Sequence, residues 1–392
     1  MSRTKVYGQG LPAVKQPSMA ASRLTSLDVF RGLSIFAMLL VCNPGDALHN
    51  YPLLTHAKWN HITPADLIFP FFLFALGLAL AAELRPYVSS ASENGQRRRD
   101  RALYLRLIRR SSILVLLGLL LNAVPEFNPA TWRIPGVLQR IAICYLAAAL
   151  IFLHVSLRRQ WVLVLAILAG YTALLDCTGA PGLAPGLLEP AANLPRWVDL
   201  TLFSPEHLFN ACPTDPEGLL STPAAVVSVL LGCWVGRVVI SRPSSHHRSV
   251  LIISSGFVCS LAGWALSPEI PIIKIIWTPT YVLFAGGLAI LCFGLCSLLT
   301  DARPAAGWIW ILQVFGRNAI LAYTLSEVAS DTLSVINMHG TPFSLFATSG
   351  IVSLTGGRVS LELGSFLYAC LLTCVIWGIC ALLYRHRWFI RI

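Results

Sequence analysis

Long apolar segments alternate with short polar stretches along most of this 392-residue chain. A segment of about 20 mostly apolar residues can cross the hydrocarbon of a bilayer as an α-helix. Backbone groups must be satisfied internally there, so a helix is favoured for each segment. The blocks that meet this description are residues 27–42, 64–84, 103–121, 137–153, 161–175, 222–240, 250–266, 281–299, 308–328 and 366–384. The pattern predicts an all-α fold, a polytopic membrane helical bundle of about ten transmembrane helices.

A weaker apolar stretch at residues 343–352 is too short to span a bilayer. Ser349 and Gly350 also interrupt it. We expect a re-entrant or surface element here. If the stretch spanned the bilayer instead, the topology of the C-terminal part would change.

The composition supports the membrane prediction. The chain is 56% hydrophobic and 12% charged, and its mean hydropathy is +0.69, which is far from an ordinary soluble domain. A net charge of +11 could on its own indicate a nucleic-acid partner. The placement of the basic residues favours membrane orientation instead, and we expect no nucleic acid.

The basic residues cluster on alternate loops of the predicted topology. One side carries most of them, including the run RRRDRALYLRLIRR. The opposite side and the helix interiors carry only Lys58, Arg133, Arg140, Arg196, Lys274, Arg317 and Arg358. Because cytoplasmic loops are enriched in Lys and Arg, we predict both termini in the cytoplasm and His56 on the outer face.

The chain is predicted to contain one folded domain. Residues 1–22 lack an apolar period and are expected to form a flexible cytoplasmic tail, followed by a single transmembrane domain over residues 23–392. Two outer loops, 43–63 and 178–221, could together cover a site, because long loops are often functional. The basic stretch 86–101 is explained by topology and by contact with anionic membrane lipid. We find no internal repeat, phosphate loop or zinc-type spacing, and expect no metal.

The block at 27–42 is expected to stay as a membrane helix, because Asp28 and Arg31 enter it and no small-residue cleavage site follows. Most of the eleven cysteines lie in predicted helices and are expected to be small apolar packing residues. Cys177 and Cys212 share the outer loop region. A disulfide could join them in an oxidising compartment, although the sequence does not show whether they are bridged.

Ionisable residues occur in or at the start of the predicted membrane helices. They are Asp28, Arg31, Asp66, Arg140 and Arg317. Such residues are costly in a bilayer and are a reason to look for function. Asp28 and Arg31 are three residues apart and can pair on one helical face. The alternative interpretation is that all five form structural ion pairs and helix-end anchors.

The loop 43–63 is the strongest candidate for chemistry. A histidine can accept and donate a proton near physiological pH, and His56 is our first candidate base. His49 and His61 lie in the same loop, so residue type alone does not choose, and a histidine without catalytic work is the alternative.

Other polar residues of the outer loops have two interpretations. Asn43 and Asn60 could cap helices or donate hydrogen bonds to a reacting carbonyl. Asp215 and Glu217 could be solvated loop charges. Spacing alone leaves an enzyme and a transporter equally open.

Six motifs in a fixed order make the sequence more specific. They are SLDVFRGLSIFAMLLVCNPG, HAKWNHITPADLIFPFFLFALGL, RIPGVLQRIAICYL, DPEGLLST, KIIWTPTYVLFAGGLAIL and FGRNAILAY. Together they resemble the heparan-α-glucosaminide N-acetyltransferase family of transmembrane acyltransferases, from about Leu24 to the C-terminus. The chain looks more like the bacterial NagX-like members than the lysosomal one, because it has no room for an added lumenal domain and no Asn-X-Ser/Thr sequon.

The resemblance implies an acetyltransferase in a bacterial inner membrane. The enzyme would move acetyl from cytosolic acetyl-CoA to the amine of glucosamine or a related amino-sugar on the periplasmic side. Family members also imply a homodimer. The family's catalytic histidine and the asparagine of the same motif carry over to His56 and Asn60, and the asparagine after the first helix carries over to Asn43. His61 replaces the glycine usual in this motif, which could alter loop shape or acceptor choice.

The resulting hypothesis gives His56 the role of general base, with Asn43 or Asn60 donating to the oxyanion. Candidate acetyl-CoA contacts are Arg31, Arg140 and Arg317, and candidate acceptor contacts are Asp66, Glu217 and Trp59. Asp66 or Glu217 could also orient His56. An acetyl-histidine intermediate is a competing route. The functional alternatives are an O-acyltransferase for a cell-envelope glycan and a sugar or ion transporter.

Overall fold

The chain folds almost entirely into helices. The computed structural model describes residues 25–88, 101–241, 246–302 and 307–389, so the predicted N-terminal tail lies outside the described residues. The longer helices are α1 (Thr25–Cys42), α2 (Ile68–Val88), α4 (Arg101–Leu121), α5 (Val137–His154), α6 (Leu157–Cys177), α8 (Thr222–Ser241), α9 (His246–Ala265), α10 (Pro279–Ala302), α12 (Ala319–Val335) and α14 (Leu361–Arg385). The shorter helices are α7 (Leu194–Phe203), α11 (Gly307–Arg317), α13 (Phe343–Leu354) and the 3-10 turns η1 (Pro52–Leu54), η2 (Pro64–Leu67) and η3 (Pro205–His207).

Two small antiparallel hairpins complete the described structure. The strands β1 (Leu188–Glu189) and β2 (Ala192–Asn193) form one, and β3 (Asn337–Met338) and β4 (Thr341–Pro342) form the other. Within the described residues, eight helical segments are long and apolar enough to cross a membrane. The predicted polytopic helical membrane protein is therefore confirmed.

One predicted span is wrong in detail. Residues 308–328 were expected to form a single helix, but α11 ends at Arg317 and α12 begins at Ala319. Asn318 between them has φ −119° and ψ 33°, which is not helical. The Asn318 side chain is fully buried, and its amide donates to the carbonyl oxygen of Cys380 at 3.5 Å. The helix breaks because this polar residue turns into the bundle, although apolar residues continue on both sides.

Close helix crossings depend on glycines. Gly77 of α2 packs on the backbone of Val229, and Gly232 of α8 packs on the backbone of Phe74. In the same way Gly32 of α1 contacts the backbone of Leu312 in α11. A side chain at any of these glycines would collide with the facing backbone. Small residues at interfaces are how membrane helices approach closely.

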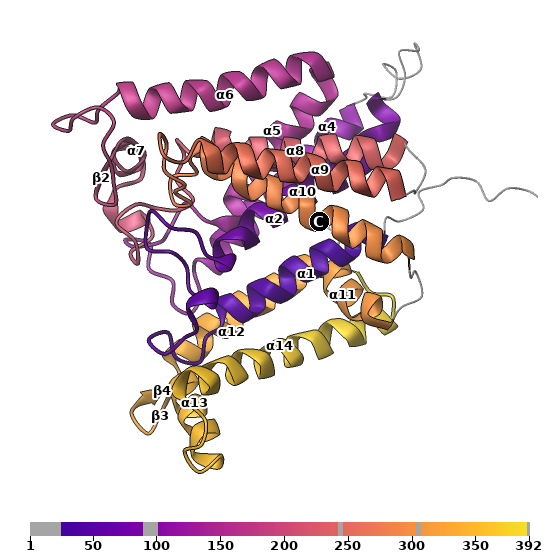
Figure 1. Ribbon diagram of the computed structural model, residues 1–392. Coiled ribbons are helices and arrows are strands. Elements are labelled where there is room, and N and C mark those ends of the chain that lie inside the picture. The colour runs from indigo at the N-terminus through magenta and orange to yellow at the C-terminus, as the bar shows by residue number, and fades with distance from the viewer. Residues whose placement is uncertain (1–24, 89–100, 242–245, 303–306, 390–392) are drawn as a thin grey trace, which may run out of the picture.

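The bundle has two distinct ends (Figure 1). The hairpins, α7 and α13 gather at one end, together with the indigo loop that follows α1. We call this the loop end and define it as residues 43–67, 122–136, 178–221, 266–278 and 336–360. The opposite end, where α1, α4 and α9 begin and α2, α8 and α10 finish, is called the arginine end.

Loops 43–63 and 178–221 meet at the loop end. The indole nitrogen of Trp59 donates to the carbonyl oxygen of Leu188 at 2.7 Å, which ties loop 43–63 to loop 178–221. Cys177 and Cys212 are both free, so no disulfide joins them. The short helix α13 has 12 residues, in keeping with a segment too short to span.

Candidate active site

A large cavity runs through the bundle between its two ends. Its volume is about 1870 Å³, and its lining comes from α1, α2, α4, α5, α11, α12 and the outer loops. We call it the central cavity. At the arginine end it is lined by Arg31, and at the loop end by His56 and Asp66. The cavity thus joins two groups of charged residues that lie far apart along the helices.

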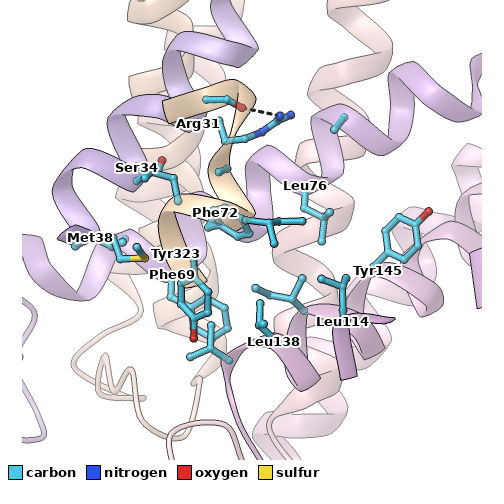
Figure 2. A pocket seen from close by; sticks show the side chains of 18 of the residues that line it. Arg31, Ser34, Met38, Phe69, Phe72, Leu76, Leu114, Leu138, Tyr145 and Tyr323 are labelled. Carbon is cyan, nitrogen blue, oxygen red and sulfur yellow. Dashed lines mark hydrogen bonds between the residues drawn. The ribbon is translucent and has the colours of Figure 1, made fainter. Parts of the chain in front are cut away.

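The middle of the central cavity is apolar. Figure 2 shows Arg31 toward one end and Phe69 and Tyr323 toward the other. Met38, Phe72 and Leu76 lie between these points in this view, and Leu114 and Leu138 add further apolar side chains to the lining. Such a lining accommodates an extended, mostly uncharged chain and gives little support to a free ion in transit.

The sequence Thr63-Pro64-Ala65-Asp66 fixes the first polar group at the loop end. Thr63 is the N-cap of η2, Pro64 opens the turn, and Asp66 reaches back to the backbone amide of Thr63 at 3.0 Å. This capping box satisfies backbone donors that a helix start leaves unpaired. It also holds the Asp66 carboxylate rigidly at the beginning of α2.

His56 pairs with this carboxylate. Its Nδ1 lies 2.9 Å from Asp66 Oδ1, while Asp66 Oδ2 accepts from the backbone amide of Ala57 at 3.1 Å. The Asp66 side chain is fully buried, whereas the His56 side chain is 49% exposed and lines the central cavity. When Nδ1–H donates to Asp66, Nε2 keeps its lone pair and can accept a proton from a substrate.

Lys274 completes the group and was not singled out from the sequence as a site residue. Its Nζ lies 3.2 Å from Asp66 Oδ1 and 3.0 Å from His56 Nδ1. A single Nδ1 atom cannot both donate to Asp66 and accept from Lys274. The charge-assisted bond to Asp66 satisfies Lys274 without that conflict, and leaves His56 in the tautomer that can act as a base.

A buried turn holds Lys274 in place. Ile273 and Ile276 are fully buried and pack with Trp59, and the hydroxyl of Thr278 accepts from the Ile273 amide at 3.0 Å. The available sequence signal was the motif KIIWTPTY, in which one lysine begins a run of apolar residues. The residue of loop 43–63 that Lys274 contacts is His56, which is more than 200 residues away in the sequence. Only the packing of the folded chain reveals this contact.

A second charged group lines the same end of the cavity. Arg133 Nη2 lies 2.9 Å from Asp215 Oδ1 and 2.6 Å from Glu217 Oε2. The guanidinium also lies over the Phe209 ring at 4.5 Å. Burial opposes the charge on Arg133, but the carboxylates of Glu217 and Asp215 outweigh it and raise the pKa of the guanidinium. Glu217, predicted for acceptor binding, is therefore a paired residue of the cavity wall.

Asp199 and Arg140 lie beside this wall and outside the lining of the central cavity. Burial of the fully enclosed Asp199 carboxyl raises its pKa to about 6, with a further contribution from Asp215. Arg140 is 1% exposed and donates to the Gly218 carbonyl at 2.6 Å and to the Ser221 hydroxyl. Arg140, a predicted acetyl-CoA contact, does not lie near Arg31 and Arg317. Helix α5 begins at the loop end, and Arg140 lies in its first turn.

The two predicted oxyanion donors do not face His56. Asn43 is buried, and its amide group donates to Leu39 and to Ser326, both at 2.8 Å. Asn60 is exposed and does not line the central cavity. Trp59, predicted for acceptor binding, joins the two outer loops instead of entering the cavity. Asn43 and Trp59 therefore support the wall behind the reacting groups.

Arg31 and Arg317 both line the arginine end of the cavity, as a binding role would require. Arg31 donates to the Gly316 carbonyl at 3.0 Å, and Arg317 lies over the ring of Phe389 at 3.7 Å. Further charged side chains of this end, not selected from the sequence, are Arg85, Arg110, Arg248, Asp28 and Glu83. Five arginines against two carboxylates leave an excess of three positive charges, which suits a polyanionic group.

Among the described residues, no group of three or more His, Cys, Asp or Glu side chains could hold a metal ion.

Comparison with known proteins agrees with the motifs. Residues 23–203 match a family model described as heparan-alpha-glucosaminide N-acetyltransferase, catalytic. The chain is 27% identical over 379 residues to the human heparan-alpha-glucosaminide N-acetyltransferase, covering 82% of this chain and 55% of that protein. The mouse protein of the same name is 26% identical over 367 residues, with 79% and 54% covered. The chain spans about half the length of these curated relatives, and the resemblance seen in the motifs is confirmed.

Proposed function

Since residues 23–203 match the catalytic region of the heparan-alpha-glucosaminide N-acetyltransferase family, we propose that this chain is a membrane acetyltransferase. It transfers acetyl from acetyl-CoA to the amine of glucosamine or a related amino-sugar. His56 is the general base. Orientation by the basic loops places the arginine end in the cytoplasm and the loop end on the far side, which is the periplasm in a bacterial inner membrane.

The continuous central cavity is the observation that carries this proposal. Phosphates of acetyl-CoA bind near Arg31 and Arg317, and the pantetheine arm passes the apolar middle between Phe72 and Leu114. The thioester then reaches His56 at the loop end. One molecule can thus be held from one side of the membrane while its acetyl group reacts near the other.

The reaction follows from groups at the loop end. The neutral amine attacks the thioester carbonyl, a C–N bond forms, and the C–S bond breaks. His56 Nε2 takes the proton from the amine and returns a proton to the leaving thiolate, which departs as coenzyme A. Asp66 holds the imidazole and stabilises its charged form. The Cys42 and Tyr323 side chains line the space in front of these groups.

Lys274 is the best-placed donor to the oxyanion that forms during attack. Its ammonium has three hydrogens, lines the cavity and lies beside His56. Charge held in advance near a developing oxyanion lowers the barrier, because little reorganisation is needed. We therefore assign to Lys274 the role first considered for Asn43 and Asn60, because Asn43 bonds to Leu39 and Ser326 and Asn60 is exposed.

The assay uses purified protein, radiolabelled acetyl-CoA and glucosamine, with His56→Ala as the test variant. His61→Ala is the matched control, because His61 is in the same loop, exposed and outside the cavity lining. We expect acetylated sugar from the unmodified protein and from His61→Ala, and none from His56→Ala. Equal product from His56→Ala would remove His56 as the base.

Two further arms separate the alternatives. Glucose replaces glucosamine to detect O-acyl transfer, and reconstituted vesicles with labelled sugar detect transport of unchanged substrate. Product on hydroxyl acceptors, or uptake without acetyl-CoA, would overturn amine acetylation. A homodimer follows from the family resemblance, and the detergent-corrected mass of the particle tests it.

A further inference from the structure

Glu327 is a carboxylate in the central cavity that the mechanism above does not use. It lies on α12 and lines the cavity together with Tyr323, one helical turn earlier. No described residue forms a hydrogen bond or ion pair with its side chain. An ionisable group held in a membrane bundle without a partner costs free energy, which is a reason to look for a function.

The other carboxylates at this end of the cavity all have cationic partners. Asp66 is paired with Lys274 at 3.2 Å, and Glu217 is paired with Arg133 at 2.6 Å. Glu327 therefore differs from Asp66 and Glu217 in pairing, although all three line the same cavity. Its negative charge is available to a cation that the described residues do not supply.

The packing of α12 places Glu327 near the end of the cavity that His56 lines. Ser326, the preceding residue, accepts a hydrogen bond from Asn43 just after α1, which fixes this turn of α12 against the end of α1. Cys42 at the end of α1 lines the cavity together with Glu327 and Lys274. Lys274 in turn lies 3.0 Å from His56. Glu327 and His56 therefore line the same part of the cavity, which a small acceptor would occupy.

We propose that Glu327 binds the ammonium group of the amino-sugar acceptor and so determines the preference for amines. This inference rests on the proposed acetyltransferase function and deepens it. The ammonium pairs with Glu327 on entry and releases one proton to solvent before attack, so His56 Nε2 stays free to take the second proton as the C–N bond forms. The acetylated product carries a neutral amide, so its pairing with Glu327 is lost. Glu327 thereby favours the substrate over the product and over neutral sugars.

Steady-state kinetics with Glu327→Gln test the proposal. We expect the KM for glucosamine to rise about tenfold or more, because a charge-assisted contact of about 1.4 kcal/mol is lost. The KM for acetyl-CoA should not change. Glu327→Asp keeps the charge on a shorter side chain and should recover part of the affinity. Asp331→Asn is the matched control, because Asp331 lies one turn further along α12 and does not line the cavity.

Thermal stability separates a recognition role from a structural one. Removing an unpaired charge should leave the Tm of Glu327→Gln equal or higher. A lower Tm, together with equal changes in both KM values, would indicate a structural residue and overturn the proposal. An unchanged KM for glucosamine would do the same.

A binding measurement keeps this inference distinct from the acetyltransferase function. Glucosamine should raise the Tm of the unmodified protein more than N-acetylglucosamine does, and Glu327→Gln should abolish that difference. If the unmodified protein shows this difference but makes no product, the acetyltransferase proposal fails and ammonium recognition stands. If the difference is absent, or persists in Glu327→Gln, ammonium recognition by Glu327 is overturned.

Discussion

The two ends of the central cavity hold their charges in different ways. At the loop end, Asp66 accepts hydrogen bonds from His56, Lys274, the Ala57 amide, and the amide and hydroxyl of Thr63. At the arginine end, Arg317 lies against aromatic rings and Arg85 is exposed. Asp66 at the loop end is held by a closed network of hydrogen bonds, whereas the arginine end gathers several arginines on the cavity wall, two of them beside carboxylates.

This difference matches two kinds of task. Bond making needs groups held in one geometry, because small displacements cost large factors in rate. Binding phosphates needs positive charge that can adapt to a flexible nucleotide, and a general field is enough. Substitutions at the loop end should therefore change kcat or folding, and those at the arginine end should change the KM for acetyl-CoA.

The largest effect is expected from Asp66→Asn. The amide cannot stabilise the charged imidazole or pair with Lys274, so kcat should fall by roughly 10³-fold or more. The KM for acetyl-CoA should stay close to its original value. Asp46→Asn is the matched control. Asp46 pairs with another histidine of loop 43–63, His49, at 2.7 Å, and it lies outside the cavity lining. Equal loss in both variants would contradict the role of Asp66.

Arg133→Gln should be the most destabilising change among the charged residues considered. It leaves Asp215, whose side chain is fully buried, and the nearly buried Glu217 without their cation. Breaking one partner of a buried ion pair costs about 3–5 kcal/mol. Unfolding in detergent, followed by helical circular dichroism, measures the loss. Arg85→Gln, at the exposed arginine end, should leave the midpoint of unfolding unchanged. A loss of stability of similar size in Arg85→Gln would contradict the proposed difference between the two ends.

Asp199→Asn should stabilise the protein in a pH-dependent way. Because the pKa of Asp199 in the folded protein is about 6, above the ordinary aspartate value of 3.8, the folded state keeps its proton between these pH values while the unfolded state loses it. The free energy of unfolding therefore falls by roughly 3 kcal/mol at most as pH rises from about 4 to 6. It stays at the lower value above that range. Melting at pH 4 and pH 7.5 checks this. The gain from Asp199→Asn should appear only at the higher pH.

The smallest effect is expected at the arginine end. Arg317→Gln should raise the KM for acetyl-CoA by about tenfold, or about 1.4 kcal/mol, with kcat retained. Added salt should narrow the difference from the unmodified protein, because screening weakens the charge that was removed. Arg196→Gln at the loop end, outside the central cavity, is the control. A change in kcat alone would contradict the assignment of acetyl-CoA binding to the arginine end.

The sequence was a good guide to helices and a partial guide to the site. Apolar length predicted the membrane bundle, because each segment must satisfy its own backbone. His56 and Asp66 could be selected from one motif, and the capping box at Thr63 explains why the carboxylate is fixed. The break at Asn318 was missed, since apolar residues flank it and hydropathy does not register a single buried polar side chain.

Contacts between distant segments could not be predicted in this way. Lys274 contacts His56, and Glu327 lines the same cavity, although both come from the second half of the chain. Arg140 shows the converse, because its position in a membrane helix suggested a ligand contact, while its guanidinium is used by Gly218 and Ser221. An ionisable residue within a membrane helix indicates that a partner exists. It does not indicate whether that partner is a ligand or another group of the protein.

The break between α11 and α12 also decides where a cation is anchored. In an uninterrupted helix, the Gly316 carbonyl would accept from the amide of Ile320. Here Arg31 of α1 donates to that carbonyl at 3.0 Å. The interruption thus converts a main-chain oxygen into a docking point for a side chain of another helix. Restoring helical continuity at Asn318 would remove this acceptor from Arg31. An uncharged break in the backbone therefore sets the position of a positive charge at the arginine end of the cavity.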